Sequence, residues 1–212
     1  MSPKVIRLVI AALAILFAAA FMSRPAPPTV LVARIGMTYD EVIERSSYPA
    51  SAHGMSPAGD EHGFGTIDVT KPAVIIKYDD PQHGFELPPT KFAALTFGDS
   101  ILKTISTSPM LEARRFPEAV EVLARLQVDF LARGWVPWKG NQSVWFDLSP
   151  AGRIALHAEL MRYSQAEQWL VVPHRHVGMI FRIKCVDDCD DEDDARFLID
   201  VGLGKEVGDG TP

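Results

Sequence analysis

The residues with the clearest chemical character lie near the C-terminal end, where seven carboxylates fall within eight positions. They are Asp187, Asp188, Asp190, Asp191, Glu192, Asp193 and Asp194. Oxygen-rich loops bind Ca²⁺, but an EF-hand loop has a glycine at its sixth position and a glutamate at its twelfth. Counting from Asp187, those positions hold Glu192 and Leu198. We therefore expect a solvated tip between two strands, which discourages edge aggregation. Binding of a cation or of a basic partner by these carboxylates is the alternative.

Two cysteines, Cys185 and Cys189, lie at the start of this acidic run and are the only ones in the chain. In an exported protein they meet an oxidising compartment, where pairing is the default. A disulfide between them would close a small loop. Reduced thiols and a metal role are the alternatives, although two cysteines alone do not complete a structural zinc site, which needs four ligands.

His174 and His176 form the only close histidine pair. Residues two apart in an extended strand face the same side, so both imidazoles could reach one metal ion. A third ligand would come from His53, His62, His83 or an acid, and the sequence does not fix which. Surface or interface histidines are the ordinary interpretation, and we predict no metal and no other cofactor.

Four tryptophans, at 135, 138, 145 and 169, lie in the second half of the chain. Core packing is the ordinary explanation for such large side chains. The alternative is a partly exposed aromatic patch of Trp135, Trp138 and Trp145 that contacts a partner, because tryptophan is enriched in binding hot spots.

No catalytic residue can be assigned from sequence motifs. The chain contains no G-x-S-x-G elbow, no G-x-x-x-x-G-K-[ST] loop and no H-E-x-x-H helix. An enzyme is therefore the less favoured interpretation, although a pair of acids cannot be recognised from sequence and a hydrolase stays open.

The N-terminal residues have the pattern of an export signal. Lys4 and Arg7 precede the uncharged apolar run 8–22, and Pro25, Pro27 and Pro28 follow it. Fifteen helical residues span about 22 Å, against a hydrocarbon core of about 30 Å. Either the segment is cleaved at the small residues 18–20, or it stays as a single-pass anchor with its basic end in the cytoplasm. No cysteine lies near residue 20, so lipid attachment at a new N-terminus is excluded.

Charge limits the partners of the remaining chain. The first 28 residues hold three basic and no acidic side chains, so 18 Lys and Arg residues and 27 Asp and Glu residues follow, a formal charge of −9. Nucleic acid and anionic lipid both require clustered positive charge. We therefore expect no nucleic acid partner, and membrane contact only through the N-terminal segment.

The pattern along the chain predicts an α+β fold, with short helices packed on antiparallel sheet after an N-terminal hydrophobic helix. Thr38 and Glu41 form a capping box, Pro117 begins the best helix and Ser149-Pro150 caps another. We expect helices at 39–48, 117–133 and 150–164, strands at 30–35, 73–78, 91–97, 101–106, 177–184 and 195–201, a hairpin within 135–148 and a loop at 51–70. The expected divisions are a leader and spacer at 1–28, α+β layers at 29–110 and 111–204, in one domain or two, and a flexible tail at 205–212.

One family comparison arises from residues 36–106. Gly36-Met37-Thr38-x-x-Glu41-Val42, a short helix ending before Pro49, and strands ending in Leu95-Thr-Phe-Gly-Asp99 resemble the BamE (SmpA/OmlA) family of outer-membrane assembly lipoproteins. The resemblance implies a layer of helix and antiparallel sheet with a binding rather than a catalytic role. This chain lacks the N-terminal lipid-bearing cysteine of that family and has a long loop before the first of these strands. The resemblance places no functional residue.

Taken together, these features predict an envelope protein that is exported to the periplasm or anchored in the inner membrane with its domain on the periplasmic side. It would act as a module that binds another protein, for example in envelope assembly. An immunity protein that neutralises a basic toxin with its acidic tip is one alternative. An extracytoplasmic hydrolase is the other.

The intact mass of protein extracted from membranes tests the anchor. If the leader is retained, the mass is that of the full chain, 23.3 kDa. If the leader is a cleaved signal, about 20 residues are missing and the remainder is recovered without detergent. A cleaved leader would rule out the interpretation as a membrane anchor.

Overall fold

The structure, a computed structural model, describes residues 28–173 and 176–205. The apolar run 8–22, His174 and residues 206–212 of the tail lie outside the described residues. Among the helices of the described part, none is both long enough and apolar enough to cross a membrane. The sequence prediction of an N-terminal hydrophobic helix therefore stays a prediction.

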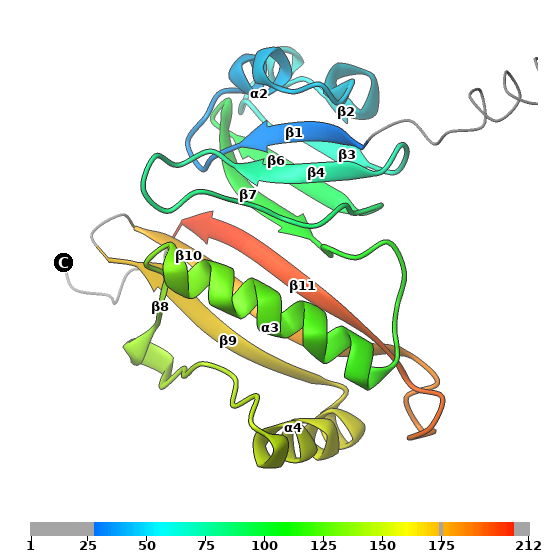
Figure 1. Ribbon diagram of the computed structural model, residues 1–212. Helices are drawn as coiled ribbons and strands as arrows, with labels where there is room; N and C mark the ends of the chain where they lie inside the picture. The colour runs from blue at the N-terminus through cyan, green and yellow to red at the C-terminus, as the bar shows by residue number, and fades with distance from the viewer. Residues whose placement is uncertain (1–27, 174–175, 206–212) are drawn as a thin grey trace, which may run out of the picture.

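The described residues form the predicted α+β fold (Figure 1). The α-helices are α2 (Tyr39–Arg45), α3 (Phe116–Ala132) and α4 (Pro150–Tyr163), and short 3-10 turns occur at η1 (Ala50–His53), η2 (Pro57–Gly59) and η3 (Lys139–Asn141). The strands are β1 (Thr29–Ala33), β2 (Gly54–Met55), β3 (Gly65–Val69), β4 (Val74–Tyr78), β5 (Phe85–Glu86), β6 (Ala93–Gly98), β7 (Ile101–Thr107), β8 (Val136–Pro137), β9 (Gln165–Val172), β10 (Val177–Asp187) and β11 (Arg196–Lys205).

Eight strands make one antiparallel sheet in the order β2-β3-β6-β7-β11-β10-β9-β8. The first four come from the N-terminal half of the chain and the last four from the C-terminal half. The two halves meet where β7 pairs with β11, with Thr107 opposite Val201 and Thr104 opposite Gly204. The sheet is therefore continuous from one half to the other.

A second layer covers one face of this sheet. It consists of the small sheet β1-β4-β5, of α3, which lies in front of β10 and β11 in Figure 1, and of α4, which contacts β9 and β10. Phe130 of α3 lies between Phe85 of β5 and Phe181 of β10, with ring centroids 4.9 and 5.2 Å away. One cluster of buried apolar residues joins both halves through these contacts.

The residues that were predicted from sequence to begin helices do so in the structure. The side chains of Thr38 and Glu41 form the reciprocal capping box of α2, and the hydroxyl of Ser149 accepts a hydrogen bond from the backbone of Gly152 at the start of α4. Pro117 lies in the first turn of α3. Each signal is short-range, so it works without knowledge of the tertiary structure.

Other expectations are wrong. Residues 51–70 are not only a loop, because β2 and β3 lie within them and pair in the large sheet. Residues 135–148 do not form a hairpin, because β8 pairs with β9, with Val136 opposite Val171. Trp145 is therefore not in a strand. The strand β9 was not predicted, and Lys205, expected in the tail, belongs to β11.

Replacing Phe130 with alanine should destabilise the protein strongly. The side chain is fully buried and contacts rings from two other elements, so Phe130→Ala should lower the unfolding free energy by about 3–5 kcal/mol. Denaturant unfolding measures this loss. The neighbouring Leu131 is 56% exposed, so Leu131→Ala should change stability by less than about 0.5 kcal/mol. Equal losses for the two variants would contradict the packing described here.

Candidate functional site

The face of the large sheet opposite the helices carries mainly small side chains. Successive residues of a strand point to opposite faces, so the residues between the buried ones of β10 and β11 point away from the core. The strand registers place these outward residues in two rows across the sheet. One row is Trp169, Ile180, Gly202, Ser106 and Ala94, and the other is Val171, Gly178, Gly204, Thr104 and Thr96.

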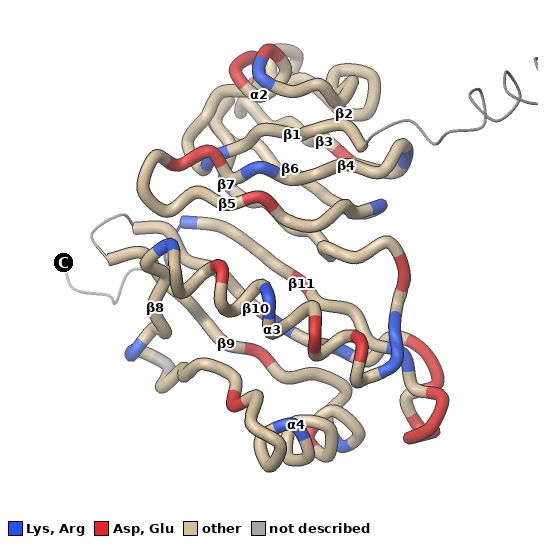
Figure 2. The backbone as a smooth tube through the Cα atoms, viewed as in Figure 1, with Lys and Arg blue, Asp and Glu red and all other residues tan. Residues whose placement is uncertain are grey.

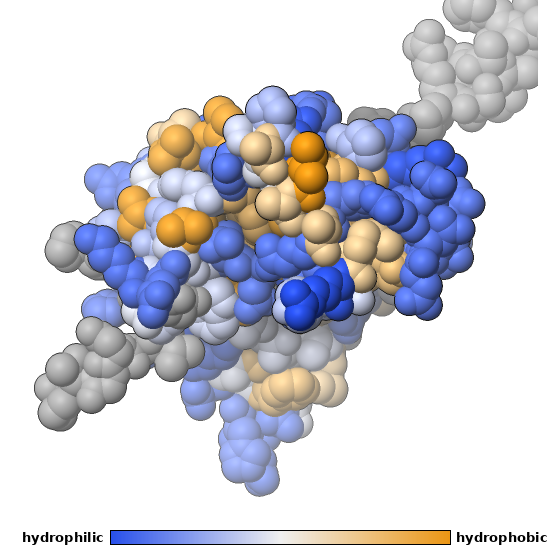
Figure 3. All heavy atoms as spheres, turned by 90° about the horizontal axis from the view of Figure 1, so that it is seen from below, coloured by the Kyte–Doolittle hydropathy of each residue, from blue (hydrophilic) through white to orange (hydrophobic). Residues whose placement is uncertain are grey.

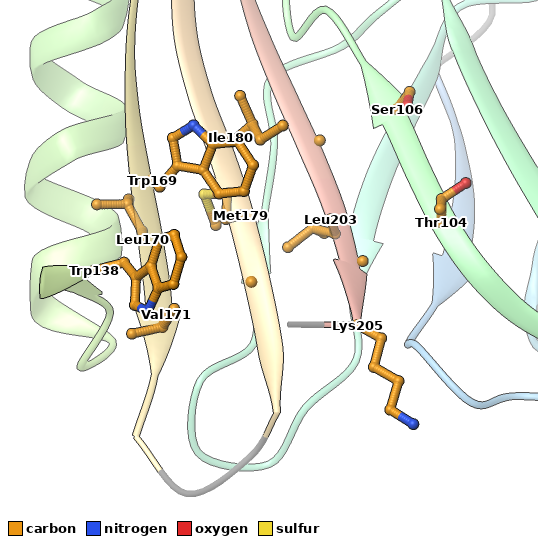
Figure 4. Close-up of a pocket in the computed structure, with 13 residues that line it drawn as sticks. Thr104, Ser106, Trp138, Trp169, Leu170, Val171, Met179, Ile180, Leu203 and Lys205 are labelled. Atoms are coloured by element: carbon orange, nitrogen blue, oxygen red, sulfur yellow. The ribbon is translucent and has the colours of Figure 1, made fainter. Parts of the chain in front are cut away.

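A groove of about 290 Å³ lies on this face (Figure 4). We call it the sheet-face groove. Its lining residues are Thr104, Ser106, Trp138, Trp169, Leu170, Val171, Gly178, Met179, Ile180, Gly202, Leu203, Gly204 and Lys205. Most of these residues are apolar or glycine, and the volume is at the lower end of the usual range for ligand sites. The groove therefore suits an apolar side chain or small apolar group.

Two tryptophans form one wall of the sheet-face groove. The ring centroids of Trp138 and Trp169 are 5.8 Å apart, and Figure 4 shows both rings on the same side of the sheet as Ile180. The backbone N–H of Trp138 donates to the carbonyl of Trp169 at 2.8 Å. A side chain at Gly140 would collide with the Trp138 ring, so this glycine lets the η3 turn fold beneath the indole.

Glycines make the floor of the groove. Gly178 faces Gly204 across β10 and β11, and Gly202 faces Ile180. A Cβ atom added at Gly202 would lie 3.9 Å from Cβ of Ile180, and one at Gly204 would lie 3.7 Å from the nearest backbone oxygen. Both are ordinary contacts, so the backbone does not require glycine there for lack of space. Side chains at these positions would instead fill the groove.

A polar network continues the same face beyond Ile180. Asp200 accepts hydrogen bonds from Ser108, from Lys184 at 2.7 Å and from Arg182 at 3.1 Å. Burial by itself raises the pKa of Asp200, but the hydrogen bonds from Lys184 and Ser108, with Arg182 beside them, outweigh burial and hold the pKa below its ordinary value. Asp200 is thus ionised at neutral pH, and both of its carboxylate oxygens accept hydrogen bonds.

The structure does not bring together Trp135, Trp138 and Trp145, the aromatic patch that was the alternative to core packing. Trp135 is fully buried, and its indole N–H donates to the carbonyl of His83 at 3.1 Å, so it belongs to the core. Trp145 is partly buried and packs against the core. Of the three predicted residues, only Trp138 lines the groove, and its partner is Trp169.

The acidic run forms the exposed tip of the β10–β11 hairpin, the red segment at the lower right of Figure 2. The predicted disulfide is confirmed: Cys185 and Cys189 are bonded, with their Cα atoms 5.8 Å apart. Asp194 pairs with Arg115 at 2.7 Å, and a carboxylate oxygen of Glu192 lies 3.6 Å from Nδ1 of His157. These contacts tie the tip to the beginning of α3 and to α4.

The acidic run does not assemble a metal site within the described residues, and the candidate pair His174 and His176 stays untested. Within residues 28–173 and 176–205, no three His, Cys, Asp or Glu side chains are grouped so that they could hold a metal ion. His176 is exposed in the turn between β9 and β10, and its predicted companion His174 is outside the described residues.

A small cavity of about 100 Å³ contains the ionisable residues Arg34, Tyr78, Asp80 and His83. Their positions have structural explanations. Oδ1 of Asp80 accepts the backbone N–H groups of Gln82 and His83, and Nδ1 of His83 lies 2.7 Å from the carbonyl of Arg133, at the end of α3. The cluster therefore fixes the turn after β4 against α3.

Exposed apolar residues also occur on the helices. Val128, Leu131, Ile154 and Tyr163 are each more than half exposed. Figure 3, seen from below, shows hydrophobic residues as separate orange spots between hydrophilic ones. Scattered apolar residues are normal on protein surfaces. The sheet-face groove differs because its apolar residues line one concave site.

Comparison of the chain with models of protein families, with characterised proteins and with solved structures found no match.

The Asp200 network predicts a pH dependence. An acid whose pKa is lower in the folded than in the unfolded protein stabilises the fold above its unfolded pKa, and this contribution is lost as the pH falls through the folded pKa. The unfolding free energy of wild type should therefore exceed that of Asp200→Asn most clearly above the ordinary aspartate value of 3.8. The difference should shrink as the pH falls below 3.8. A difference that grows with acidification would contradict the assignment.

Proposed function

We propose that this chain is an exported envelope protein, anchored in the inner membrane or released to the periplasm, and that it binds another protein through the sheet-face groove. The observation that carries the proposal is the pair Trp138 and Trp169 beside a floor of glycines on the sheet face opposite the helices. Tryptophan is enriched in binding hot spots, and glycine within a strand often marks the close approach of another chain.

The sequence features support the same proposal. The apolar leader motivates the envelope location, and the resemblance of residues 36–106 to the BamE family motivates a binding role in envelope assembly. The groove is mainly apolar, and the nearby cations Arg182 and Lys184 both pair with Asp200. This arrangement favours binding over hydrolysis.

A photo-cross-linking residue at Thr104 tests the proposal in native cells. Thr104 is exposed and lines the groove. We expect a cross-link to one specific protein at Thr104 and none at the control position Val128, which is 67% exposed on α3. Gly202→Leu should reduce the cross-link at least about tenfold by filling the groove.

The matched control is Gly59→Leu, because a Cβ atom at Gly59 would meet nothing within 4 Å. It should leave the cross-link unchanged. If Gly202→Leu has no effect, the groove is not the binding surface. If the cross-link is lost instead with Asp188→Asn and Asp190→Asn, the acidic tip makes the contact, as the immunity-protein alternative requires.

A further inference from the structure

We propose that the sheet-face groove recognises an extended peptide segment that places an apolar side chain on the Trp138–Trp169 pair and a carboxylate, two residues further along, at Arg182. The inference rests on the proposed function and specifies the chemistry of the partner. It follows from the shape of the open sheet face, from the unused donors of Arg182 and from the local charge.

The groove continues along the strands. A second cavity of about 260 Å³ shares Ser106, Ile180 and Gly202 with the sheet-face groove and also contains Arg182 and Lys184. Along β10, the joined site extends from Gly178 to Lys184. Six residue steps of about 3.3 Å give about 20 Å, the length of about six residues of an extended peptide.

The two parts of this joined site differ in chemistry. Around the tryptophan pair, the lining side chains Val171 and Ile180 are apolar. At the other end, Arg182, Lys184 and Asp200 line the site, with the half-exposed ring of Phe92 beside them. A matching ligand therefore has an apolar group at one end and a charged group at the other.

Arg182 has donors that the protein does not use. One terminal nitrogen pairs with Asp200 at 3.1 Å, and the other is 3.7 Å from Glu167, too far for a hydrogen bond. Its Nε atom is buried and has no hydrogen-bond partner. The buried Nε atom is closed to a ligand, but the Arg182 side chain is 30% exposed. A ligand carboxylate would therefore accept a charge-assisted bond from the terminal nitrogen that faces Glu167.

The local charge also favours an anionic group. Four charged residues line the two cavities: Arg182, Lys184 and Lys205 are basic, and Asp200 is acidic. The site is thus locally basic in a chain with a net charge of −6. An acidic segment complements it, whereas a basic partner would be repelled.

The strand register sets the spacing of the two ligand groups. Trp169 lies opposite Ile180, and Arg182 is two residues further along β10 and opposite Glu167. Side chains on one face of an extended peptide repeat every two residues, about 7 Å apart. The recognised pattern is therefore an apolar residue, any residue, and then an aspartate or glutamate.

Calorimetric titration of the full-length protein in lipid nanodiscs tests this pattern. The probe is a capped Gly/Ser heptapeptide with phenylalanine and glutamate two positions apart. We expect the peptide with glutamine in place of glutamate to bind about tenfold more weakly or worse, because a hydrogen bond to a charged group is lost. A peptide with the two residues four positions apart should also bind more weakly.

Arg182→Gln should bind both peptides equally weakly. Arg196→Gln is the matched control, since Arg196 is on the same face but lines neither cavity, and it should keep the preference for glutamate. Equal binding of the two peptides by wild type overturns the inference, and that comparison does not depend on how any variant folds. A preference for the glutamate peptide that survives in Arg182→Gln also overturns the inference.

A lipid ligand is the other outcome to be distinguished. Dodecanoic acid also joins an apolar chain to a carboxylate, so Arg182-dependent binding of this acid without binding of the peptide would assign the groove to a lipid and overturn the inference. If Gly202→Leu abolishes the cellular cross-link at Thr104 while the peptides show no carboxylate dependence, only the proposed chemistry of the partner fails. If Gly202→Leu leaves that cross-link intact, the proposed function itself fails.

Discussion

The pairing of β7 with β11 is the contact on which the rest of the structure depends. It joins strands from the two halves of the chain and fixes which side chains of β11 point to the core. In the observed register, Val201 and Leu203 are buried while Gly202 and Gly204 face outward. A slip of one residue would reverse this arrangement. It would expose two apolar side chains and bury the glycines, so the hydrophobic core and the groove are set by the same hydrogen bonds.

The glycine floor has an energetic cost. Each glycine within a strand or helix is less favourable than alanine by roughly 0.5–1 kcal/mol, and Gly178, Gly202 and Gly204 lie next to one another in β10 and β11. At Gly202 and Gly204 a methyl group would fit without a clash, so packing in the folded protein does not account for them. The proposed binding function would account for them, because a side chain at either position would fill the groove.

The sequence predicts those parts of the fold that depend on neighbouring residues. The capping box at Thr38, the proline that begins α3 and the Cys185–Cys189 disulfide all involve partners a few positions apart. The strand β3 was missed because it is short and follows a segment rich in glycine and histidine. The strand β9 begins with four residues of which three are polar, and its apolar part is too short to show a period.

The groove could not be predicted because it depends on long-range pairing. Trp138 meets Trp169 only because β8 pairs with β9, and a local hairpin was the expected partner of β8. Gly178 meets Gly204 only in the β10–β11 register. A sequence signal did exist: two outward glycines, Gly202 and Gly204, alternate with apolar residues in a strand. Without the register, their alignment with Gly178 and with the tryptophans is not visible.

The measurement that tests the central claim most directly is the change in the amide and indole NMR signals of the full-length protein when its cellular partner binds. The account predicts that the largest shifts occur at the indole groups of Trp138 and Trp169 and at the amides of Ile180 and Gly202. Shifts confined to the acidic tip or to α3 and α4, with these signals unchanged, would contradict it.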